Sequence, residues 1–320
     1  MSTAIPTAHT PGVTPATVSF TPLVIRSPGR PVDLTVRVSA PVTGDALPVV
    51  LLSHGHGPSN YVSSLYGYGP LADYYAAHGF VVIQPTHLSS ATLGLRESDR
   101  QGAPLFWRER ALDMHLILDR LDRIEADVPL LKGRMDHGRV AVVGHSMGGH
   151  TAGLLLGARL KDPADGSDVG LADPRITAGV MISAPGRGGA ALSEHAAEHY
   201  PFFGAPDFST MTTPTLVVAG DDDHVEYLTV VGPSWFTDPY TLSPSPKSLL
   251  TVLRGGHGVG GVAGYDLKET TDESPQMVSL VRRVSAAYLR SQLYPGNSAF
   301  QKAVDALAAE DSPLGRVESK

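Results

Sequence analysis

The chain contains no cysteine, which excludes disulfide bonds, thiolate metal sites and a cysteine nucleophile. It has no Lys/Arg-rich block, and its net charge is a mild −7, so nothing indicates a nucleic-acid-binding surface. No segment approaches the ~18 continuous apolar residues that a membrane-spanning helix needs. Residues 1–20 lack the basic start and apolar run of a signal peptide, and we therefore expect a cytoplasmic protein. A chain whose leader had been removed would show the same pattern.

A chain of 320 residues is long enough for one large domain with a substantial core. We predict a flexible arm over residues 1–18, a main domain over residues 19–294, and a short helix and tail over residues 295–320. We interpret residues 184–213 as a small cap or insertion within the main domain. Its aromatic side chains either line a pocket or pack the insertion onto the sheet; they are Tyr200, Phe202, Phe203 and Phe208.

Short apolar runs rich in β-branched residues alternate with helical patterns along the main domain. Buried strands are predicted at residues 48–53, 80–85, 140–143, 176–183, 214–219 and 247–253, and helices at 71–78, 106–127, 274–293 and 298–309. This alternation predicts an α/β fold in which helices cover both faces of a mostly parallel central sheet. The alternating segment 22–40 predicts two antiparallel strands at the sheet edge.

The helix predicted at residues 106–127 has a clear apolar stripe, which contains Met114, Ile117, Leu118, Leu121 and Ile124. We assign its charged residues to a solvated face; they are Arg108, Glu109, Arg110, Asp113, Asp119, Arg120, Asp122 and Arg123. Two polar segments without periodicity, 86–104 and 161–173, are predicted loops. The first follows the end of a strand, so it either walls a substrate pocket or is a plain surface loop.

The pattern Gly144-x-Ser146-x-Gly148 follows the apolar run 140–143 and precedes a helix rich in small residues. This context is typical of a nucleophile elbow, a sharp turn that exposes the serine hydroxyl above the sheet. The glycines remove side chains that would collide at the turn. The helix that begins there points its first backbone N–H groups at an oxyanion forming beside Ser146, and we choose Met147 as the donor.

The run His54-Gly55-His56-Gly57 comes directly after an early buried strand. Elbow-type hydrolases place the second oxyanion donor in such a loop, and we predict the backbone N–H of His56 as that donor. The alternative is metal binding, because His-x-His can hold zinc. No third ligand lies at a suggestive spacing, so we favour the backbone role.

Two further reactive positions follow buried strands: the acidic cluster 221–223 and His257, which is flanked by glycines. The carboxyl ends of parallel strands share one edge of the sheet, so Ser146, one of these aspartates and His257 can converge. Serine, acid and histidine in this chain order is a known triad order. A Ca²⁺ site on three consecutive carboxylates is not favoured, because successive side chains diverge and no EF-hand spacing is present.

Together these motifs resemble those of α/β-hydrolase-fold serine esterases over residues 20–290. More narrowly, the chain resembles the dienelactone-hydrolase-like group, which includes chlorophyllases and platelet-activating-factor acetylhydrolases. In those two relatives the triad acid follows the strand after the nucleophile helix, but here that strand ends in Ser183-Ala184-Pro185 without a carboxylate. The acid is therefore expected one strand later. In related hydrolases Gly-x-x-Asp places it at the fourth position, which is Asp223 here, with Asp221 as the alternative.

The resemblance implies hydrolysis of a carboxylic ester through an acyl-enzyme on Ser146. His257 acts as general base and acid, Asp223 orients it, and the N–H groups of His56 and Met147 hold the oxyanion. No cofactor or metal is expected, and the expected partner is a small, partly apolar ester. The alternatives are an acyltransferase, a lactone or amide hydrolase with the same triad, and a catalytically silent binding protein of this fold.

Overall fold

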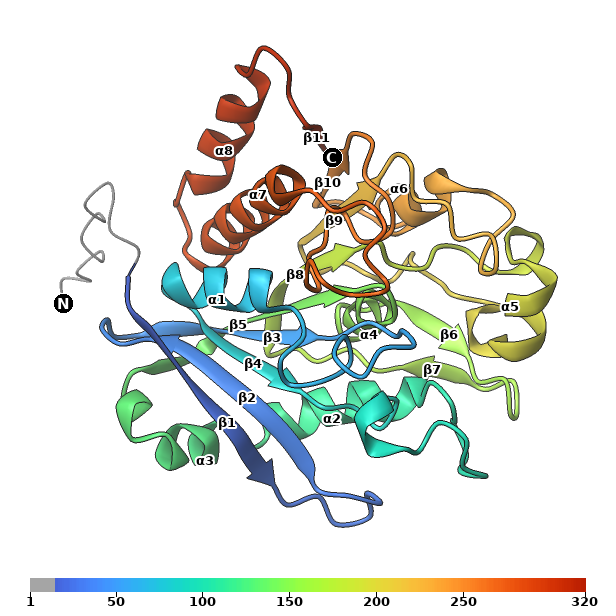
Figure 1. Ribbon diagram of the computed structural model, residues 1–320, viewed down its shortest axis with the longest axis horizontal. Coiled ribbons are helices and arrows are strands. Elements are labelled where there is room, and N and C mark those ends of the chain that lie inside the picture. Colours follow the sequence, from blue (N-terminus) through green and yellow to red (C-terminus); the bar gives the residue numbers. More distant parts are fainter. Residues whose placement is uncertain (1–14) are drawn as a thin grey trace.

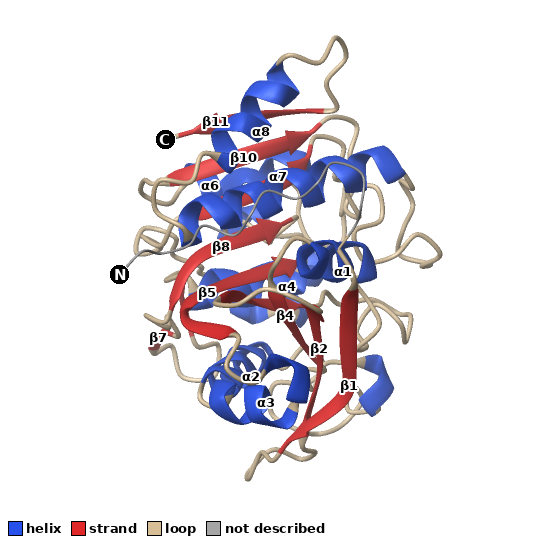
Figure 2. Cartoon of the chain, turned by 90° about the vertical axis from the view of Figure 1, so that its left-hand side faces the viewer, coloured by secondary structure: helices blue, strands red, loops and turns tan. Residues whose placement is uncertain are grey.

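The computed structural model describes residues 15–320, and most of its strands form one nine-stranded sheet. Residues 1–14 of the predicted flexible arm lie outside the described part of the chain. The spatial order of the strands is β1-β2-β4-β3-β5-β8-β9-β10-β11, and Figure 2 shows them stacked from β11 at the top to β1 at the lower right. Their bounds are β1 Thr17–Ile25, β2 Leu34–Pro41, β3 Leu47–Ser53, β4 Val81–Pro85, β5 Met135–His145, β8 Ile176–Ile182, β9 Thr215–Gly220, β10 Lys247–Val252 and β11 Gly315–Ser319.

The central strands β4, β3, β5, β8, β9 and β10 run parallel, and β1, β2 and β11 at the edges pair antiparallel. The predicted α/β fold with a mostly parallel sheet is confirmed. Since the strands point the same way, their carboxyl ends meet at one edge. The loops after β3, β5, β9 and β10 therefore gather there, which is where every predicted site residue lies.

Helices cover both faces of this sheet (Figure 1). One face carries α1 (Gly69–Ala77) and α7 (Pro275–Leu293), and the other carries α2 (Trp107–Leu118), α3 (Leu121–Asp127) and α4 (Met147–Leu155). Successive strand residues point to opposite faces: Val50 and Leu52 pack in the first core, and Val49 and Leu51 in the second. This two-sided burial explains the continuous apolar runs in the sequence.

The single helix predicted at residues 106–127 is two helices, because Arg120 leaves the helical conformation with φ −121° and its N–H bonds to the Ile117 carbonyl instead of continuing the ladder. The prediction of a solvated charged face is wrong for two of its members. Arg110 is 0 % and Asp113 3 % exposed. The physical reason lies in the site described below, where both side chains find buried hydrogen-bond partners.

The end of the chain also differs from the predicted tail. After α8 (Ala299–Ala308), β11 pairs antiparallel with β10. This pairing satisfies backbone groups of β10 that would otherwise form an open sheet edge. A five-residue strand carries too little alternation to be read from sequence.

The segment 161–173, predicted as a loop, contains part of a small hairpin formed by β6 (Arg159–Lys161) and β7 (Asp168–Gly170). Residues 184–213 form α5 (Glu194–His199) and the 3₁₀ turns η3 (Gly189–Ala191) and η4 (Pro201–Phe203). A second irregular stretch before β10 holds η5 (Pro233–Thr237) and α6 (Asp238–Thr241); η1 (Ala91–Leu93) and η2 (Pro129–Leu131) complete the elements. Within residues 15–320, no helix combines the length and the apolar character needed to cross a bilayer.

Candidate active site

Ser146 lies between β5 and α4 in a strained turn, with φ 55° and ψ −120°. A residue with a side chain rarely adopts this conformation, and such strain is held in place by its surroundings. Here the N–H of Ser146 donates to the Ile182 carbonyl on β8 at 2.9 Å. A Cβ on Gly148 would approach the His54 carbonyl oxygen to 2.8 Å, so glycine is required where the elbow presses on the neighbouring loop.

The structure brings Ser146, His257 and Asp223 into one chain of hydrogen bonds. The Nε2 atom of His257 lies 2.9 Å from the Ser146 Oγ, and its Nδ1 lies 3.1 Å from each carboxylate oxygen of Asp223. Because a carboxylate only accepts, Nδ1 carries the hydrogen and Nε2 is free to accept the serine proton. The Asp223 side chain is 0 % exposed and that of His257 is 26 % exposed, so the acid is enclosed and the imidazole remains accessible.

The other two aspartates of the cluster have separate partners. Asp221 accepts the Arg254 N–H at 2.5 Å and so ties the loop after β9 to the loop after β10. Asp222 is 69 % exposed and lies 3.3 Å from the exposed His224. Neither hydrogen-bonds to His257 in the described residues, and the Gly-x-x-Asp position is the one that reaches the imidazole.

The loop that carries His257 is held by Asp272, a residue that the sequence reasoning missed. Its Oδ2 accepts the N–H groups of Gly256 at 2.8 Å and Gly260 at 2.9 Å. A carboxylate that binds backbone N–H groups at both ends of a glycine-rich loop restricts that loop. Asp272 lies in a polar stretch with no periodicity, so the sequence offered no signal for this contact.

The loop after β3 places His56 beside the elbow, and its neighbouring peptide groups are occupied by side chains. The His54 carbonyl accepts from Arg110, the Gly55 N–H donates to the Tyr68 hydroxyl at 2.9 Å, and the Gly55 carbonyl accepts from His54 Nδ1 at 2.7 Å. Within residues 15–320, the N–H of His56 has no hydrogen-bond partner. Met147 is the first residue of α4, where backbone N–H groups lack partners inside the helix.

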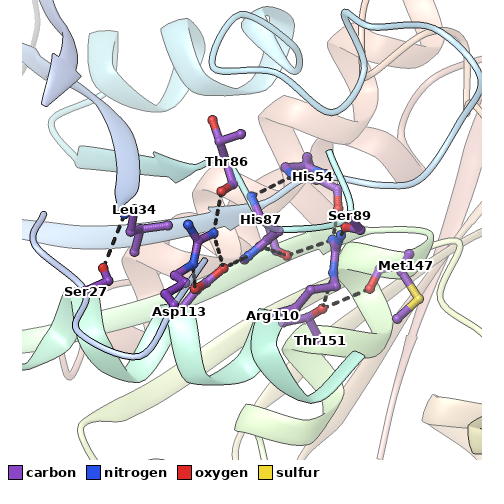
Figure 3. Close-up of polar contacts among 12 residues, drawn as sticks. Ser27, Leu34, His54, Thr86, His87, Ser89, Arg110, Asp113, Met147 and Thr151 are labelled. Atoms are coloured by element: carbon purple, nitrogen blue, oxygen red, sulfur yellow. Dashed lines mark hydrogen bonds and ion pairs between the residues drawn. The ribbon is translucent and has the colours of Figure 1, made fainter. Parts of the chain in front are cut away.

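Beneath this loop lies a buried polar cluster centred on Arg110 of α2 (Figure 3). Besides the His54 carbonyl, its guanidinium donates to the hydroxyls of Thr151 at 3.0 Å, Ser89 at 2.6 Å and Ser53 at 3.3 Å. Thr151 in turn donates to the Met147 carbonyl at 3.0 Å. One side chain of α2 therefore braces both the loop of His56 and the first turn of α4.

Asp113, one turn further along α2, completes the cluster. It accepts from Arg30 at 2.9 Å and from His87 Nδ1 at 2.9 Å, and His87 Nε2 lies 3.0 Å from the Ser53 hydroxyl. Burial raises the pKa of Asp113 to about 6, which the Arg30 guanidinium opposes, and burial lowers the pKa of Arg110 to about 9. Arg110 therefore keeps its charge at neutral pH. The sequence held one signal: Arg110 is in helical register with Met114, Ile117 and Leu121 of the apolar stripe.

The metal-binding alternative for the histidines of the 54–57 loop finds no third ligand in the part of the chain that the structure describes. No group of three or more potential metal-ligating side chains occurs within residues 15–320. Both ring nitrogens of His54 are occupied, since Nδ1 bonds to Gly55 and Nε2 accepts the His87 N–H at 3.2 Å. Burial, with smaller contributions from Arg96 and Arg110, lowers the pKa of His56 to about 3, so its ring is neutral.

A cleft of about 660 Å³ lies between residues 101–109, residues 162–167 and the segment 199–202. Its lining includes Trp107 and Phe202, whose rings stack at 6.0 Å, but not Ser146 or His257. The end of the predicted loop 86–104 therefore does line a hollow. Of the four aromatic residues in the 184–213 segment, Phe203 and Phe208 are buried and favour the packing role, whereas Phe202 is buried and also lines the cleft.

The sheet order and the elbow at the end of β5 are those of the α/β-hydrolase fold. Residues 12–161 match the family model described as Chlorophyllase, a family of α/β-hydrolase-like serine esterases, and this confirms the resemblance predicted from the sequence. The match covers the loop of His56 and the elbow and ends before Asp223 and His257. Family and fold together indicate an ester hydrolase. No curated protein gave a match to the chain.

Proposed function

We propose that the protein hydrolyses carboxylic esters through a covalent acyl-enzyme on Ser146. The observation that carries the proposal is the unbroken hydrogen-bond chain from Ser146 through His257 to Asp223. A nucleophile, a base and a group that orients the base, all within hydrogen-bond reach, are what acyl transfer requires.

In the proposed reaction, His257 Nε2 takes the proton of Ser146 as its oxygen attacks the ester carbonyl. Asp223 keeps the imidazole in the required tautomer and stabilises its charged form. The N–H groups of His56 and Met147 hold the tetrahedral oxyanion, and losing one such donor typically raises the barrier by ~2.7–4 kcal/mol. His257 then protonates the leaving alcohol, and water releases the acyl group by the same route.

We expect a small-molecule substrate with apolar character near the reacting carbonyl. The Phe236 ring packs 5.4 Å from the His257 ring, and Met147, the residue after the nucleophile, belongs to the same buried apolar cluster as Phe236. These apolar side chains packed directly behind the reacting groups motivate the expectation of an apolar acyl or alcohol chain. A panel of p-nitrophenyl esters of graded acyl length tests this expectation, which fails if the shortest, most polar ester is the best substrate.

A fluorophosphonate probe tests the nucleophile directly. We expect one covalent adduct at Ser146 by mass spectrometry, and the S146A variant should fold, take up no probe and hydrolyse esters at the background rate. The absence of an adduct in the natural chain would favour a silent binding protein. If competing alcohols or amines capture the acyl group more efficiently than water, the protein is an acyltransferase.

A further inference from the structure

Tyr68 stands out as a buried residue in an unfavourable backbone conformation beside the site. It precedes α1 with φ 63° and ψ 21°, and it is 0 % exposed. A bulky residue in the left-handed region is a genuine outlier, and such strain persists only where the surroundings hold it. Its N–H donates to the Ala263 carbonyl at 2.8 Å, beyond the loop that carries His257.

The hydroxyl of Tyr68 joins two other parts of the site. It accepts the Gly55 N–H at 2.9 Å and lies 2.8 Å from His145 Nδ1, and His145 Nε2 lies 2.7 Å from the His257 carbonyl. A carbonyl only accepts, so Nε2 of His145 carries the hydrogen. Burial, together with the nearby His257, lowers the pKa of His145 to about 3, so its ring is neutral.

These roles fix the direction of every hydrogen bond. Neutral His145 must accept at Nδ1, so the Tyr68 hydroxyl donates there and uses a lone pair for Gly55. One hydroxyl therefore connects the loop of His56, the residue before the nucleophile and, through His145, the backbone of the general base.

The contact with Gly55 also bears on the direction of the oxyanion donor. The peptide group between His54 and Gly55 is held at both ends, by Arg110 at its carbonyl and by Tyr68 at its N–H. In the next peptide group the Gly55 carbonyl points at the His54 ring. Because a trans peptide directs its C=O and N–H to opposite sides, the His56 N–H points away from that ring.

We propose that Tyr68 is a positioning residue for ester hydrolysis. Its hydroxyl holds the oxyanion loop and, through His145, the backbone of His257 in the mutual placement that the reaction needs. The inference rests on the proposed function, because it assigns a role within that site. Sub-ångström shifts of these groups lower kcat and leave substrate binding largely unchanged.

The test compares Y68F with Y75F. Tyr75 provides the matched control: it is also fully buried, lies on α1, and its hydroxyl bonds to Ser285 at 2.7 Å on the side facing α7. We expect Y68F to lower kcat for p-nitrophenyl butyrate about 10- to 100-fold, part of the loss caused by deleting an oxyanion donor, with little change in KM. Y75F should keep kcat within about twofold of the natural chain, because a remote hydroxyl affects stability alone.

A second readout separates positioning from general damage. Sulfur accepts hydrogen bonds weakly, so a thionoester gains little from an oxyanion hole. The ratio of kcat/KM for the ester to that for its thionoester should therefore fall in Y68F and stay constant in Y75F. An unchanged ratio in folded Y68F, or equal losses of kcat in the two variants, overturns the proposal.

If Y68F does not fold, two variants of His145 test the proposal instead. The amide of H145Q can still donate to the His257 carbonyl, whereas H145L cannot, so H145Q should retain at least tenfold more activity. Equal activities in these two variants overturn the proposal. Failure of the function itself is distinguishable: an active S146A variant refutes the nucleophile, whereas an inactive S146A beside a fully active Y68F refutes only the role of Tyr68.

Discussion

Replacing Asp223 with asparagine tests the geometry of the site with a single change of atom type. Asp223 is enclosed, and both of its oxygens lie 3.1 Å from His257 Nδ1. In D223N an amide N–H can face Nδ1, which then accepts the hydrogen bond and loses its own proton. The imidazole hydrogen moves to Nε2 and points at the Ser146 oxygen, so the ring can no longer accept the serine proton.

The expected loss follows from this change of tautomer. In a serine protease triad the same substitution lowers kcat about 10⁴-fold, which corresponds to about 5.4 kcal/mol in the barrier. We expect a loss of this size at pH 7, with a folded protein, because asparagine is nearly isosteric. The rate should recover partly at alkaline pH, where hydroxide removes the serine proton without the base.

The two neighbouring aspartates supply the controls. D222N loses a contact between exposed side chains, and D221N retains an amide oxygen that can accept the Arg254 N–H. Both should keep kcat/KM within about threefold, since exposed pairs contribute little. The assay is initial-rate hydrolysis of p-nitrophenyl butyrate from pH 6 to 10, with circular dichroism as the folding check. The reasoning is refuted if D221N or D222N is impaired more than D223N.

Two further predictions concern stability. R110M should lower the free energy of unfolding by about 3 kcal/mol, because it leaves the buried His54 carbonyl without a donor. The control R123M removes only the exposed ion pair between Arg123 and Asp127 and should change this free energy by less than about 0.5 kcal/mol. Equal urea midpoints for the two variants would contradict this prediction. The pKa of the buried His54, His87, His145 and His150 is lowered from 6.5 chiefly by desolvation. Below pH 6.5 the unfolded chain therefore binds more protons than the folded one, and each histidine should reduce the free energy of unfolding by up to about 1.4 kcal/mol per pH unit, until the pH reaches its folded-state pKa. Urea unfolding at pH 7, 6 and 5 measures this loss, and a flat profile would refute it.

The buried cluster beneath the site shows why residue types alone are insufficient. Asp113, His87 and Ser53 repeat the acid, histidine and serine of the proposed triad, with spacings of 2.9 and 3.0 Å. All three are buried, and Arg110 also bonds to the serine hydroxyl, so no substrate carbonyl can approach it. In the buried cluster the carboxylate, imidazole and hydroxyl brace a loop. In the proposed triad the same three groups include an imidazole, that of His257, which is accessible.

The sequence by itself determined the sheet, because strands buried on both faces must be continuously apolar and helices must show a 3.6-residue stripe. It also predicted Ser146, the 221–223 cluster and His257 as site residues, because the glycines next to them at the ends of strands can be recognised from the local sequence. The role of α2 was not readable in this way. Arg110 and Asp113 look like solvated charges until their partners from four other segments are in place.

The motif favoured Asp223 and left Asp221 as the alternative, and the tertiary structure places the carboxylate of Asp223 against the imidazole. Only the tertiary structure showed that the last residues form the edge strand β11. It alone brought the Tyr68 hydroxyl to Gly55 and His145, which are separated from it by 13 and 77 positions along the chain. The physical reason is the same in each case. A buried polar group needs partners, and those partners come from whatever segments the packing of the sheet and helices brings within 3 Å. Local sequence patterns determine the helices and strands, and the packing of these elements determines which buried polar groups become hydrogen-bond partners.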